Sequence, residues 1–495
     1  MKKLFGTDGM RGEAGRFPLD AQTIQTTGRS LARQLGARAG GERAPRIVVG
    51  RDTRESGEWI ERAFMDGARA GGAVCESAGV ITTPGVAFLT RALPAEAGVV
   101  ISASHNPYQD NGIKIFVPTG RKLDDATERL IEADIRQARA GSDESHAPER
   151  LEVSSQKVEV DDKVDDKAAL RTKDAKPQGT RDAEQRAVVL QARYLDYLAG
   201  EVAAGLRLDG LRLVVDCANG AASHLAPALF TRLGAQVSAV NNAPDGQNIN
   251  HECGSLYVER LRDKVLAEQA DLAVAFDGDA DRALFLDARG RVVDGDATLW
   301  VMAKSFQGRG ELPGERVVAT VMSNIGLELA LKSRGIEMLR TDVGDKYVLE
   351  ELLRTGAALG GEQSGHIIFP RASLAGDGMM TTLFLLRAMR ETNASLEQLA
   401  DGFTRYPQVL VNVRVGEKRP FQEVAEIAAE ARQAENSLAG NGRLLLRYSG
   451  TEPLARIMIE GQHQVEIERL AQNLAIVIER ALGHGNGNGR ENFTR

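Results

Sequence analysis

Three times along the chain, an apolar segment is followed by a helix-like segment, a glycine and a second apolar segment, and this repeat constrains the fold most strongly. The copies span Arg46–Val74, Leu211–Val237 and Arg316–Met338. Each copy predicts a strand, a helix and a second strand, and parallel strands joined in this way need a right-handed crossover connection. The sequence therefore predicts three α/β domains of related topology.

Length and local composition divide the chain further. At 495 residues it is too long for a single hydrophobic core. Residues 141–190 are rich in charged side chains and predict a solvated insertion, whereas Tyr406-Pro407 marks the entry to a last domain. Residues 484–495 are rich in glycine and asparagine and predict a disordered tail. The expected domains are 1–140, 191–292, 293–404 and 405–483.

Charge and cysteine content exclude several classes of protein. The formal net charge is -7, so no basic surface is expected to attract nucleic acid. Cys75, Cys217 and Cys253 have no metal-ligand spacing, which predicts a reduced protein without disulfides or structural zinc. The N-terminus does not resemble a signal peptide, and no apolar run is long enough to cross a membrane. We expect a cytoplasmic protein that binds neither nucleic acid nor membranes.

Polar residues follow the predicted buried strand Val99–Ile101. Ser104 and His105 come directly after it, and Pro107 ends the extended segment. The carboxyl ends of strands are where open α/β sheets bind their ligands. This position makes Ser104 and His105 candidate site residues, although an ordinary polar junction between a strand and a turn is the alternative.

Three carboxylates follow the apolar segment Ala273–Phe276 at alternate positions: Asp277, Asp279 and Asp281. Like charges about 4 Å apart repel each other by roughly 4 kcal/mol at an effective dielectric constant of 20, so we expect a bound cation. An EF-hand is excluded, since its sixth position would be Arg282 and its twelfth Ala288. Mg²⁺ shared with a phosphate group fits better. A solvated acidic turn is the alternative.

Three glycine-containing loops are further candidate binding sites. Phe5–Gly12 combines backbone amides with Arg11, which suits an anion. Gly360–His366 places Glu362 and Ser364 between glycines, where they can hydrogen-bond sugar hydroxyls. The third loop offers cationic, hydroxyl and backbone donors for a phosphate group: Arg447, Ser449, Gly450, Thr451 and Arg456. Each loop can also be an ordinary turn.

This set of sites, in this order, resembles the α-D-phosphohexomutase superfamily over nearly the whole chain. Within it, the chain is most similar to the bacterial phosphoglucosamine mutase branch. The motifs that carry the resemblance are Phe5–Gly12, Gly79–Gly85, Pro107–Phe116 and Gly360–His366. The resemblance implies three α/β domains with mixed sheets and a smaller C-terminal α+β domain around a central cleft, and it suggests a homodimer.

The resemblance also implies roles for the candidate residues. Ser104 would carry a phosphoryl group, and Mg²⁺ would be bound by the phosphoserine with Asp277, Asp279 and Asp281. The residues around the transferring group would be Arg11, His105, Lys114 and Arg282, with Lys114 or His105 as the general acid or base. Glu362 and Ser364 would bind sugar hydroxyls. The residues that hold the other phosphate would be Arg447, Ser449, Gly450, Thr451 and Arg456. Ala280 departs from the family, which usually has glycine there.

The implied reaction interconverts glucosamine 6-phosphate and glucosamine 1-phosphate through a bisphosphate, a step toward cell-wall precursors. Three alternatives stay open. Phosphomannomutase/phosphoglucomutase activity differs only in the sugar. A Ca²⁺- or sugar-binding protein without catalysis would transfer no phosphate. A phosphatase with an aspartate nucleophile would be labelled on Asp277 and would leave the Ser104 and Arg447 loops without a role.

Overall fold

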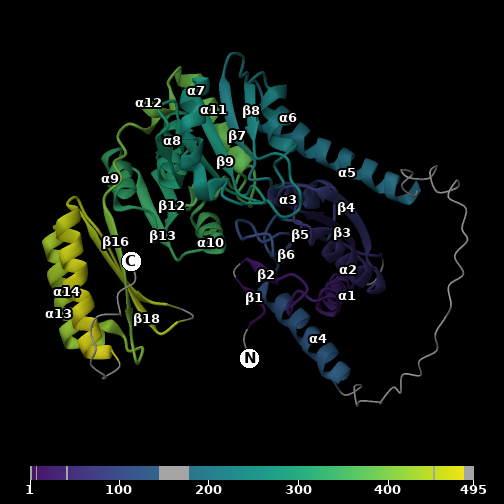
Figure 1. Ribbon diagram of the computed structural model, residues 1–495, viewed down its shortest axis with the longest axis horizontal. Helices are drawn as coiled ribbons and strands as arrows, with labels where there is room; N and C mark the ends of the chain where they lie inside the picture. The colour runs from purple at the N-terminus through teal and green to yellow at the C-terminus, as the bar shows by residue number, and fades with distance from the viewer. Residues whose placement is uncertain are drawn as a thin grey trace, which may run out of the picture.

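The computed structural model describes residues 3–6, 8–38, 40, 43–143, 178–449 and 452–483. These residues form four sheets, and the four domains built on them follow one another along an arc, with the first and last domains at its ends (Figure 1). The expected tail at 484–495 lies outside the described residues. Among the helices of the described ranges, none combines the length and apolar character that a membrane crossing requires.

Domain I is built on a mixed sheet with the strand order β1-β2-β6-β5-β3-β4. Its strands are β1 (Phe5–Gly6), β2 (Gly9–Glu13), β3 (Arg46–Arg51), β4 (Val74–Val80), β5 (Ala97–Ile101) and β6 (Asp110–Phe116). Its helices are α1 (Ala21–Arg38), α2 (Gly57–Ala70), α3 (Thr83–Ala92) and α4 (Asp125–Asp143). Ile47 and Val49 of β3 pack in one core cluster with α1, α2 and α4, whereas Val48 packs in another with α3. The sheet is therefore covered by helices on both faces.

One prediction about domain I is wrong. Residues 178–190, which we expected in a charged linker, form the first part of α5 (Gln178–Tyr197). The buried face of this helix consists of residues at helical spacing: Ala187, Leu190 and Tyr194. The helix also contacts β4, because Gln191 Nε2 donates to the carbonyls of Ala78 and Val80 at 3.0 and 3.1 Å. The many charged residues of this segment hide that apolar stripe. Residues 144–177 lie outside the described residues.

Domains II and III each carry one mixed sheet. Domain II has the order β11-β10-β9-β7-β8 and domain III the order β13-β12-β14-β15. The strands of domain II are β7 (Arg212–Asp216), β8 (Gln236–Val240), β9 (Leu272–Phe276), β10 (Ala283–Asp287) and β11 (Val292–Val293), with helices α6 (Leu225–Arg232) and α7 (Arg262–Glu268). The strands of domain III are β12 (Arg316–Thr320), β13 (Glu337–Thr341), β14 (Gly360–Gly361) and β15 (Ile367–Ile368). Its helices are α8 (Gly295–Gly308), α9 (Ile325–Ser333), α10 (Asp345–Thr355), α11 (Gly378–Thr392) and α12 (Leu396–Ala400).

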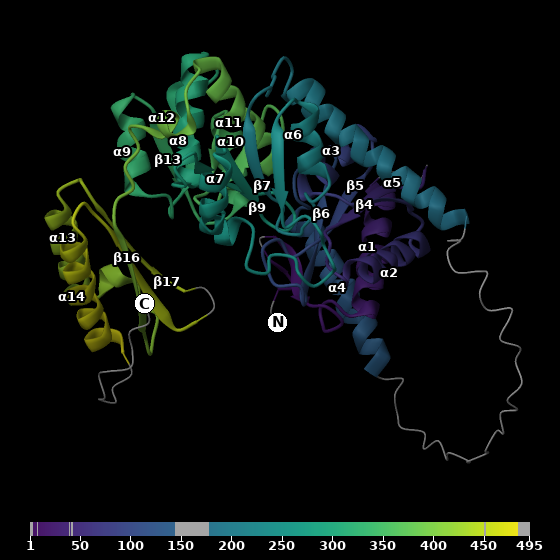
Figure 2. The ribbon, with the colours of Figure 1, turned by 45° about the horizontal axis from the view of Figure 1, so that its top comes forward.

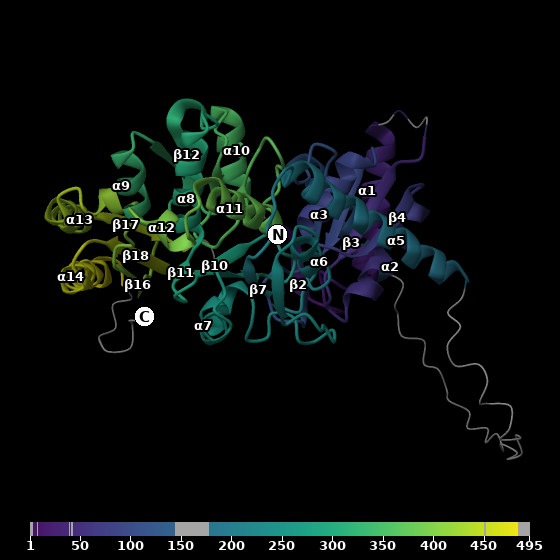
Figure 3. The same cartoon turned by 90° about the horizontal axis from the view of Figure 1, so that it is seen from above.

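The three predicted strand–helix–strand units are confirmed. Each of the pairs β3 with β4, β7 with β8, and β12 with β13 is parallel, and a helix connects its two strands. Val48, Leu213 and Val317 belong to one continuous core cluster, so domains I, II and III share apolar packing across their boundaries. The views from other directions show the same close succession of these three domains (Figures 2 and 3).

Domain IV is smaller, as the resemblance implies. Its antiparallel sheet has the order β16-β18-β17, formed by β16 (Gln408–Arg414), β17 (Arg443–Tyr448) and β18 (Leu454–Glu460), and it packs with α13 (Ala425–Leu438) and α14 (Gln464–Leu482) around a core of its own. Polar contacts attach it to domain III. The buried Glu460 carboxylate accepts from the Ile325 amide and from Arg443 Nε, both at 3.0 Å, and Arg443 Nη1 donates to the Val321 carbonyl at 2.8 Å.

Candidate active site

The loop after β5 holds Ser104 in an uncommon backbone conformation. Ser104 has φ +54, in the left-handed region, and is 1% exposed. Its amide donates to Ser102 Oγ at 2.9 Å, while its carbonyl accepts from Arg54 Nη2 at 3.0 Å and from Asn250 Nδ2 at 2.8 Å. Such strain persists only where the surroundings determine the conformation, and it is frequent at functional sites.

Arg54 organises this loop, and the sequence analysis did not identify it. Its side chain is fully buried and pairs with Asp52 at 2.9 Å. The guanidinium also donates to the carbonyls of Ser104, Asn106, Pro107 and Asp110. The signal that points to Arg54 is its position at the end of β3, because β3 lies beside β5 in the sheet and both strands end at the same edge.

The three predicted carboxylates lie directly after β9, in domain II. One oxygen from each of Asp277, Asp279 and Asp281 lies within 4.8 Å of the others. Ser104 Oγ, from domain I, donates to Asp277 Oδ2 at 2.5 Å. Ala280, where the family usually has glycine, has φ +55 and is buried; its carbonyl accepts from the Gly378 amide at the start of α11 at 3.0 Å. The left-handed conformation at Ala280 explains why glycine suits this position.

The carboxylate group fits a bound cation. Asp279 Oδ1 and Asp281 Oδ1 are buried and have no hydrogen-bond partner. Burial and the neighbouring carboxylates of Asp281 and Asp279 raise the pKa of Asp277 well above its ordinary value. A divalent cation relieves both conditions, because it supplies a partner for the free oxygens and neutralises the repulsion. A set of hard oxygen ligands suits Mg²⁺ or Ca²⁺.

Lys114 is buried among these carboxylates. Its side chain is 1% exposed, and Nζ lies 2.8 Å from Asp279, 3.2 Å from Asp8 and 3.7 Å from Asp281. Burial opposes the charged form, but the attraction of Asp279, Asp8 and Asp281 prevails and raises the pKa of Lys114. Lys114 is therefore a permanent cation at neutral pH.

His105, in contrast to Lys114, is uncharged at neutral pH. Its Nδ1 lies 3.2 Å from Ser104 Oγ. Burial, together with the positive charges of Arg282 and Arg11, lowers the pKa of His105 to about 4. The ring is consequently neutral at neutral pH. Arg11 forms an ion pair with Asp8, and Arg282 Nε lies 3.9 Å from Asp281, so both predicted arginines border the same site.

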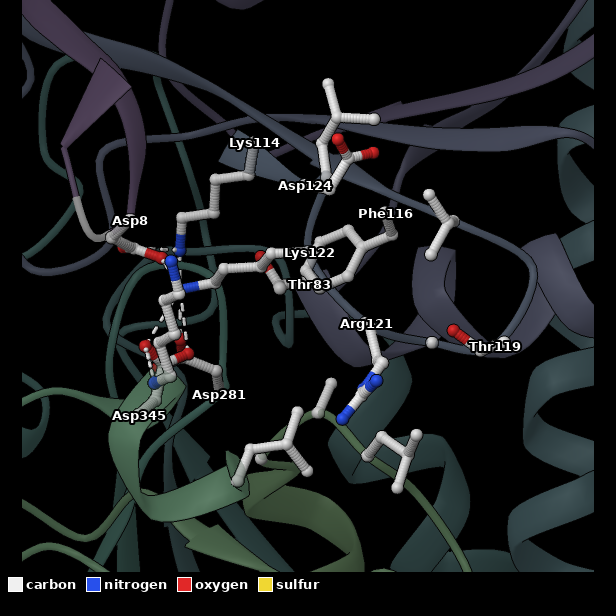
Figure 4. A pocket seen from close by; sticks show the side chains of 18 of the residues that line it. Asp8, Thr83, Lys114, Phe116, Thr119, Arg121, Lys122, Asp124, Asp281 and Asp345 are labelled. Carbon is white, nitrogen blue, oxygen red and sulfur yellow. Dashed lines mark hydrogen bonds and ion pairs between the residues drawn. The ribbon is translucent and has the colours of Figure 1, made fainter. Parts of the chain in front are cut away.

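A second group of charged residues connects domains I and III, and the sequence analysis missed it. Lys122 Nζ lies 2.6 Å from Asp8 and 2.7 Å from Asp345, and Figure 4 shows Asp8, Lys114, Lys122, Asp345 and Asp281 pointing toward one another. Together with the apolar residues Phe116 and Leu349, all five line a cavity of about 520 Å³ between domains I and III, to which domain II contributes Asp281. None of Ser104, Glu362 and Arg447 lines it.

The predicted sugar-binding loop joins β14 to β15. Glu362 Oε1 accepts from the Gly344 amide at 3.1 Å, and Ser364 Oγ lies 3.5 Å from Glu362 Oε2. At the end of the loop, His366 Nδ1 lies 3.5 Å from Asp281. Burial opposes protonation, but Asp281 prevails and raises the pKa of His366 to about 9. The structure thus brings this loop against the carboxylate group, through a histidine that we did not predict.

The predicted phosphate-binding residues lie at the end of the β17–β18 hairpin in domain IV. Arg447 and Arg456 stand directly opposite each other on the two strands. Arg456 Nη2 lies 3.4 Å from Ser449 Oγ, and Lys418 Nζ donates to the Ser449 carbonyl at 2.6 Å. Like charges in facing positions destabilise a sheet unless an anion lies between them. Gly450 and Thr451 lie outside the described residues.

This hairpin is separate from the Ser104 loop. Within the part of the chain that the structure describes, no hydrogen bond or ion pair joins the two. The ends of β17 and β18 point toward the side of domain I that carries β1 and β2 (Figures 1 and 2). The structure therefore brings together the predicted residues of domains I, II and III, and it leaves those of domain IV apart.

Known proteins resemble the chain along its whole length. The Phosphoglucomutase/phosphomannomutase profiles match as alpha/beta/alpha domain I over residues 2–141, domain II over 192–290, domain III over 294–406 and C-terminal domain over 410–477. A phosphoglucosamine mutase of Solibacter usitatus is 46% identical over 97% of this chain and 99% of its own length. The one of Syntrophotalea carbinolica is 45% identical over 97% of this chain and 98% of its own.

Two solved structures show the same fold. A phosphoglucomutase/phosphomannomutase family protein from Burkholderia thailandensis, 24% identical, superposes with a TM-score of 0.72, covering 97% of both chains. The N-acetylphosphoglucosamine mutase of Aspergillus fumigatus, solved with GlcNAc-6P and magnesium, is 18% identical, with a TM-score of 0.59 over 97% of this chain and 96% of that one. This chain accordingly belongs to the phosphoglucomutase/phosphomannomutase family, in which its full-length relatives include phosphoglucosamine mutases.

Proposed function

We propose that this chain is an isomerase that interconverts glucosamine 6-phosphate and glucosamine 1-phosphate. The full-length relatives named phosphoglucosamine mutase support the choice of sugar. The observation that carries the chemistry is the 2.5 Å contact between Ser104 Oγ and Asp277, within a buried group of three carboxylates. A serine hydroxyl held against a cation site suits a residue that accepts and returns a phosphoryl group.

In this reaction, Ser104 begins as a phosphoserine. The bond between phosphorus and Ser104 Oγ breaks while the free sugar hydroxyl forms a new bond to phosphorus. The proton of that hydroxyl ends on the departing Ser104 Oγ, so the products are a sugar bisphosphate and the free serine hydroxyl. The bisphosphate turns over in the site and returns its other phosphoryl group to Ser104, and the second sugar phosphate is released. Phosphoryl transfer needs little covalent participation by the protein, so orientation and neutralisation of charge account for most of the catalysis.

His105 and Lys114 have different parts in the transfer. Neutral His105, 3.2 Å from Ser104 Oγ, is able to accept the hydroxyl proton when Ser104 takes up a phosphoryl group. Lys114 stays protonated and serves as a fixed cation beside the transferring group, as do Arg11 and Arg282. These features favour His105 over Lys114 as the base, a choice that the sequence alone left open.

Mg²⁺ held by Asp277, Asp279, Asp281 and the phosphoserine would neutralise charge on the phosphoryl oxygens. Glu362 and Ser364 bind sugar hydroxyls. The phosphate that is not transferred is held by Arg447, Ser449, Gly450, Thr451 and Arg456. Because the sugar must bind in two orientations, one fixed anion site in domain IV serves both half-reactions. Movement of domain IV toward domain I then encloses the substrate and excludes water.

Cellular location, oligomeric state and domain boundaries complete the proposal. The three cysteines are free thiols, which supports a cytoplasmic location. A homodimer is an expectation from the family resemblance. The division into domains 1–140, 191–292, 293–404 and 405–483 is supported by the four family matches, over residues 2–141, 192–290, 294–406 and 410–477.

Steady-state kinetics with three sugar phosphates tests the proposal. We expect kcat/KM for glucosamine 6-phosphate to exceed that for mannose 6-phosphate and for glucose 6-phosphate by roughly 100-fold, as a site that recognises a polar substituent allows. Preference for mannose or glucose 6-phosphate would favour the phosphomannomutase/phosphoglucomutase alternative. No turnover of any of them by the phosphorylated protein would favour a binding protein.

A further inference from the structure

Thr83 lines the cavity between domains I and III (Figure 4), and it also contacts the carboxylate group directly. It is the first residue of α3 in domain I and is 3% exposed. Its hydroxyl donates to Asp279 Oδ2 at 2.6 Å, and its amide donates to the Asp279 carbonyl at 3.0 Å. Both donors of Thr83 are thus directed at one residue of domain II.

The capping of α3 does not need Thr83. The preceding residue, Thr82, is the N-cap, and its hydroxyl accepts from the Gly85 amide at 3.1 Å. A threonine that only capped the start of the helix would direct its hydroxyl to the helix backbone. The Thr83 hydroxyl instead points away from its own helix and contacts Asp279 across the boundary between domains I and II.

The contact determines which oxygen of Asp279 is free. Oδ2 accepts from Thr83 Oγ1 at 2.6 Å and from Lys114 Nζ at 2.8 Å, whereas Oδ1 is buried without a hydrogen-bond partner. Two donors on one oxygen prevent rotation of the carboxylate. The other oxygen is then left available as a ligand atom, in a carboxylate that has one oxygen within 4.8 Å of those of Asp277 and Asp281.

We infer that Thr83 is a positioning residue for the cation: it holds Asp279 in the orientation that presents Oδ1 to a divalent metal ion. The inference rests on the metal site of the proposed function. It also makes the site depend on contact between domains I and II, since Thr83, Lys114 and Ser104 come from the first domain and the aspartates from the second. Hydrogen-bonding partners of metal ligands typically change metal affinity 10- to 100-fold when they are removed.

The test measures Mn²⁺ binding to the full-length, dephosphorylated protein by isothermal titration, with no substrate present. Thr83→Val keeps the shape of the side chain and removes its hydroxyl, and we expect it to weaken Mn²⁺ binding about 10-fold or more. Thr83→Ser keeps the hydroxyl and should bind within about threefold of wild type. In kinetic assays, Thr83→Val should need correspondingly more Mg²⁺ for half-maximal activity, with the KM for the sugar phosphate unchanged.

Thr90→Val is the matched control. Thr90 is equally buried on the same helix, but its hydroxyl donates to the Val86 carbonyl within that helix. We expect its Mn²⁺ affinity to equal that of wild type. If Thr83→Val fails to fold, Thr83→Ala takes its place; failure of both to fold would overturn the inference, because Thr83 would then stabilise the domain contact rather than orient a ligand.

The outcomes distinguish a failure of the proposed metal site from a failure of the role of Thr83. Wild-type protein that binds no Mn²⁺ would contradict the proposed metal site itself. Wild-type protein that binds Mn²⁺ with a folded Thr83→Val variant of equal affinity would contradict only the role of Thr83. Equal weakening in Thr83→Val and Thr90→Val would also contradict it, since the effect would then belong to α3 as a whole.

Discussion

Ser104 Oγ and Asp277 Oδ2 lie 2.5 Å apart, although 173 residues separate them and they belong to different domains. The contact joins the end of β5 in domain I to the end of β9 in domain II. Because each strand ends in a loop at the boundary between these domains, the serine and the carboxylates meet only when the two domains are packed together. The shared core of domains I, II and III keeps this boundary fixed.

The loop that carries Ser104 depends on Arg54. We expect Arg54→Met to lower the free energy of unfolding by about 3 kcal/mol or more, because it leaves Asp52 as a buried charge without its ion-pair partner and removes a donor from each of four carbonyls. Urea unfolding followed by fluorescence measures the change. Arg62→Met, which removes an exposed arginine on α2, is the control and should change the value by less than about 0.5 kcal/mol. A loss below 1 kcal/mol for Arg54→Met would show that the loop is held by other contacts.

Asp377 predicts a specific dependence of stability on pH. Burial raises the pKa of this helix N-cap to about 6 from 3.8, and Tyr194 and backbone amides only partly oppose it. A raised folded pKa means that the contribution to stability is fully present below about pH 4 and is lost as the pH rises through about 6. Between pH 5 and 7.5, wild type should therefore lose about 1 kcal/mol of unfolding free energy relative to Asp377→Asn.

Unfolding curves at several pH values measure that difference. Asp377→Asn keeps the acceptor oxygen for the Met380 amide, so the helix cap survives. Asp66→Asn, an exposed residue on α2, serves as the control. A constant difference between wild type and Asp377→Asn over this range would show that Asp377 is already ionised in the folded protein at pH 5.

The facing arginines of domain IV are expected to bind the phosphate that is not transferred. Arg447→Ala should raise the KM for the sugar phosphate roughly 10- to 100-fold and lower kcat less, because hydrogen bonds to a charged group are each worth about 1.5–3 kcal/mol. Michaelis–Menten kinetics measures both constants. Arg432→Ala, an exposed arginine on α13 of the same domain, should match wild type. An unchanged KM for Arg447→Ala would place the phosphate elsewhere.

Glu460 is expected to orient the whole phosphate-binding hairpin. Its side chain is fully buried at the contact with domain III, where it accepts from the Ile325 amide and from Arg443. Glu460→Ala leaves these donors unsatisfied and frees the base of the hairpin, so we expect KM for the sugar phosphate to rise about 10-fold. Glu468→Ala on α14 is the exposed control. Wild-type kinetics for Glu460→Ala would mean that the domain contact has no influence on substrate binding.

Much of this architecture follows from local patterns in the sequence. Apolar runs such as Val99–Ile101 and Ala273–Phe276 predict buried strands, and the polar residues that follow them predict site loops. The three connections between parallel strands follow from the same periodicity. These features are local, so the sequence alone is sufficient to identify them.

Other features depend on contacts between distant segments. Arginine is usually exposed on the surface. Arg54 is buried, because four carbonyls of another loop accept hydrogen bonds from its guanidinium. Lys122 and His366 become part of the site only because domains I, II and III meet there, where Lys122 pairs with Asp345 and His366 lies beside Asp281. The apolar stripe of α5 is concealed by its charged neighbours. The local sequence does not indicate which loops lie side by side across a domain boundary.

The central claim is that Ser104 carries the phosphoryl group between the two ends of the sugar. The most direct test incubates the dephosphorylated protein with glucosamine 1,6-bisphosphate labelled with ³²P and locates the label by proteolysis and mass spectrometry. We expect stable label on Ser104, no label and no turnover in Ser104→Ala, and normal labelling in the control Ser333→Ala. Label on Asp277, or turnover by Ser104→Ala at a rate near that of wild type, would contradict the central claim.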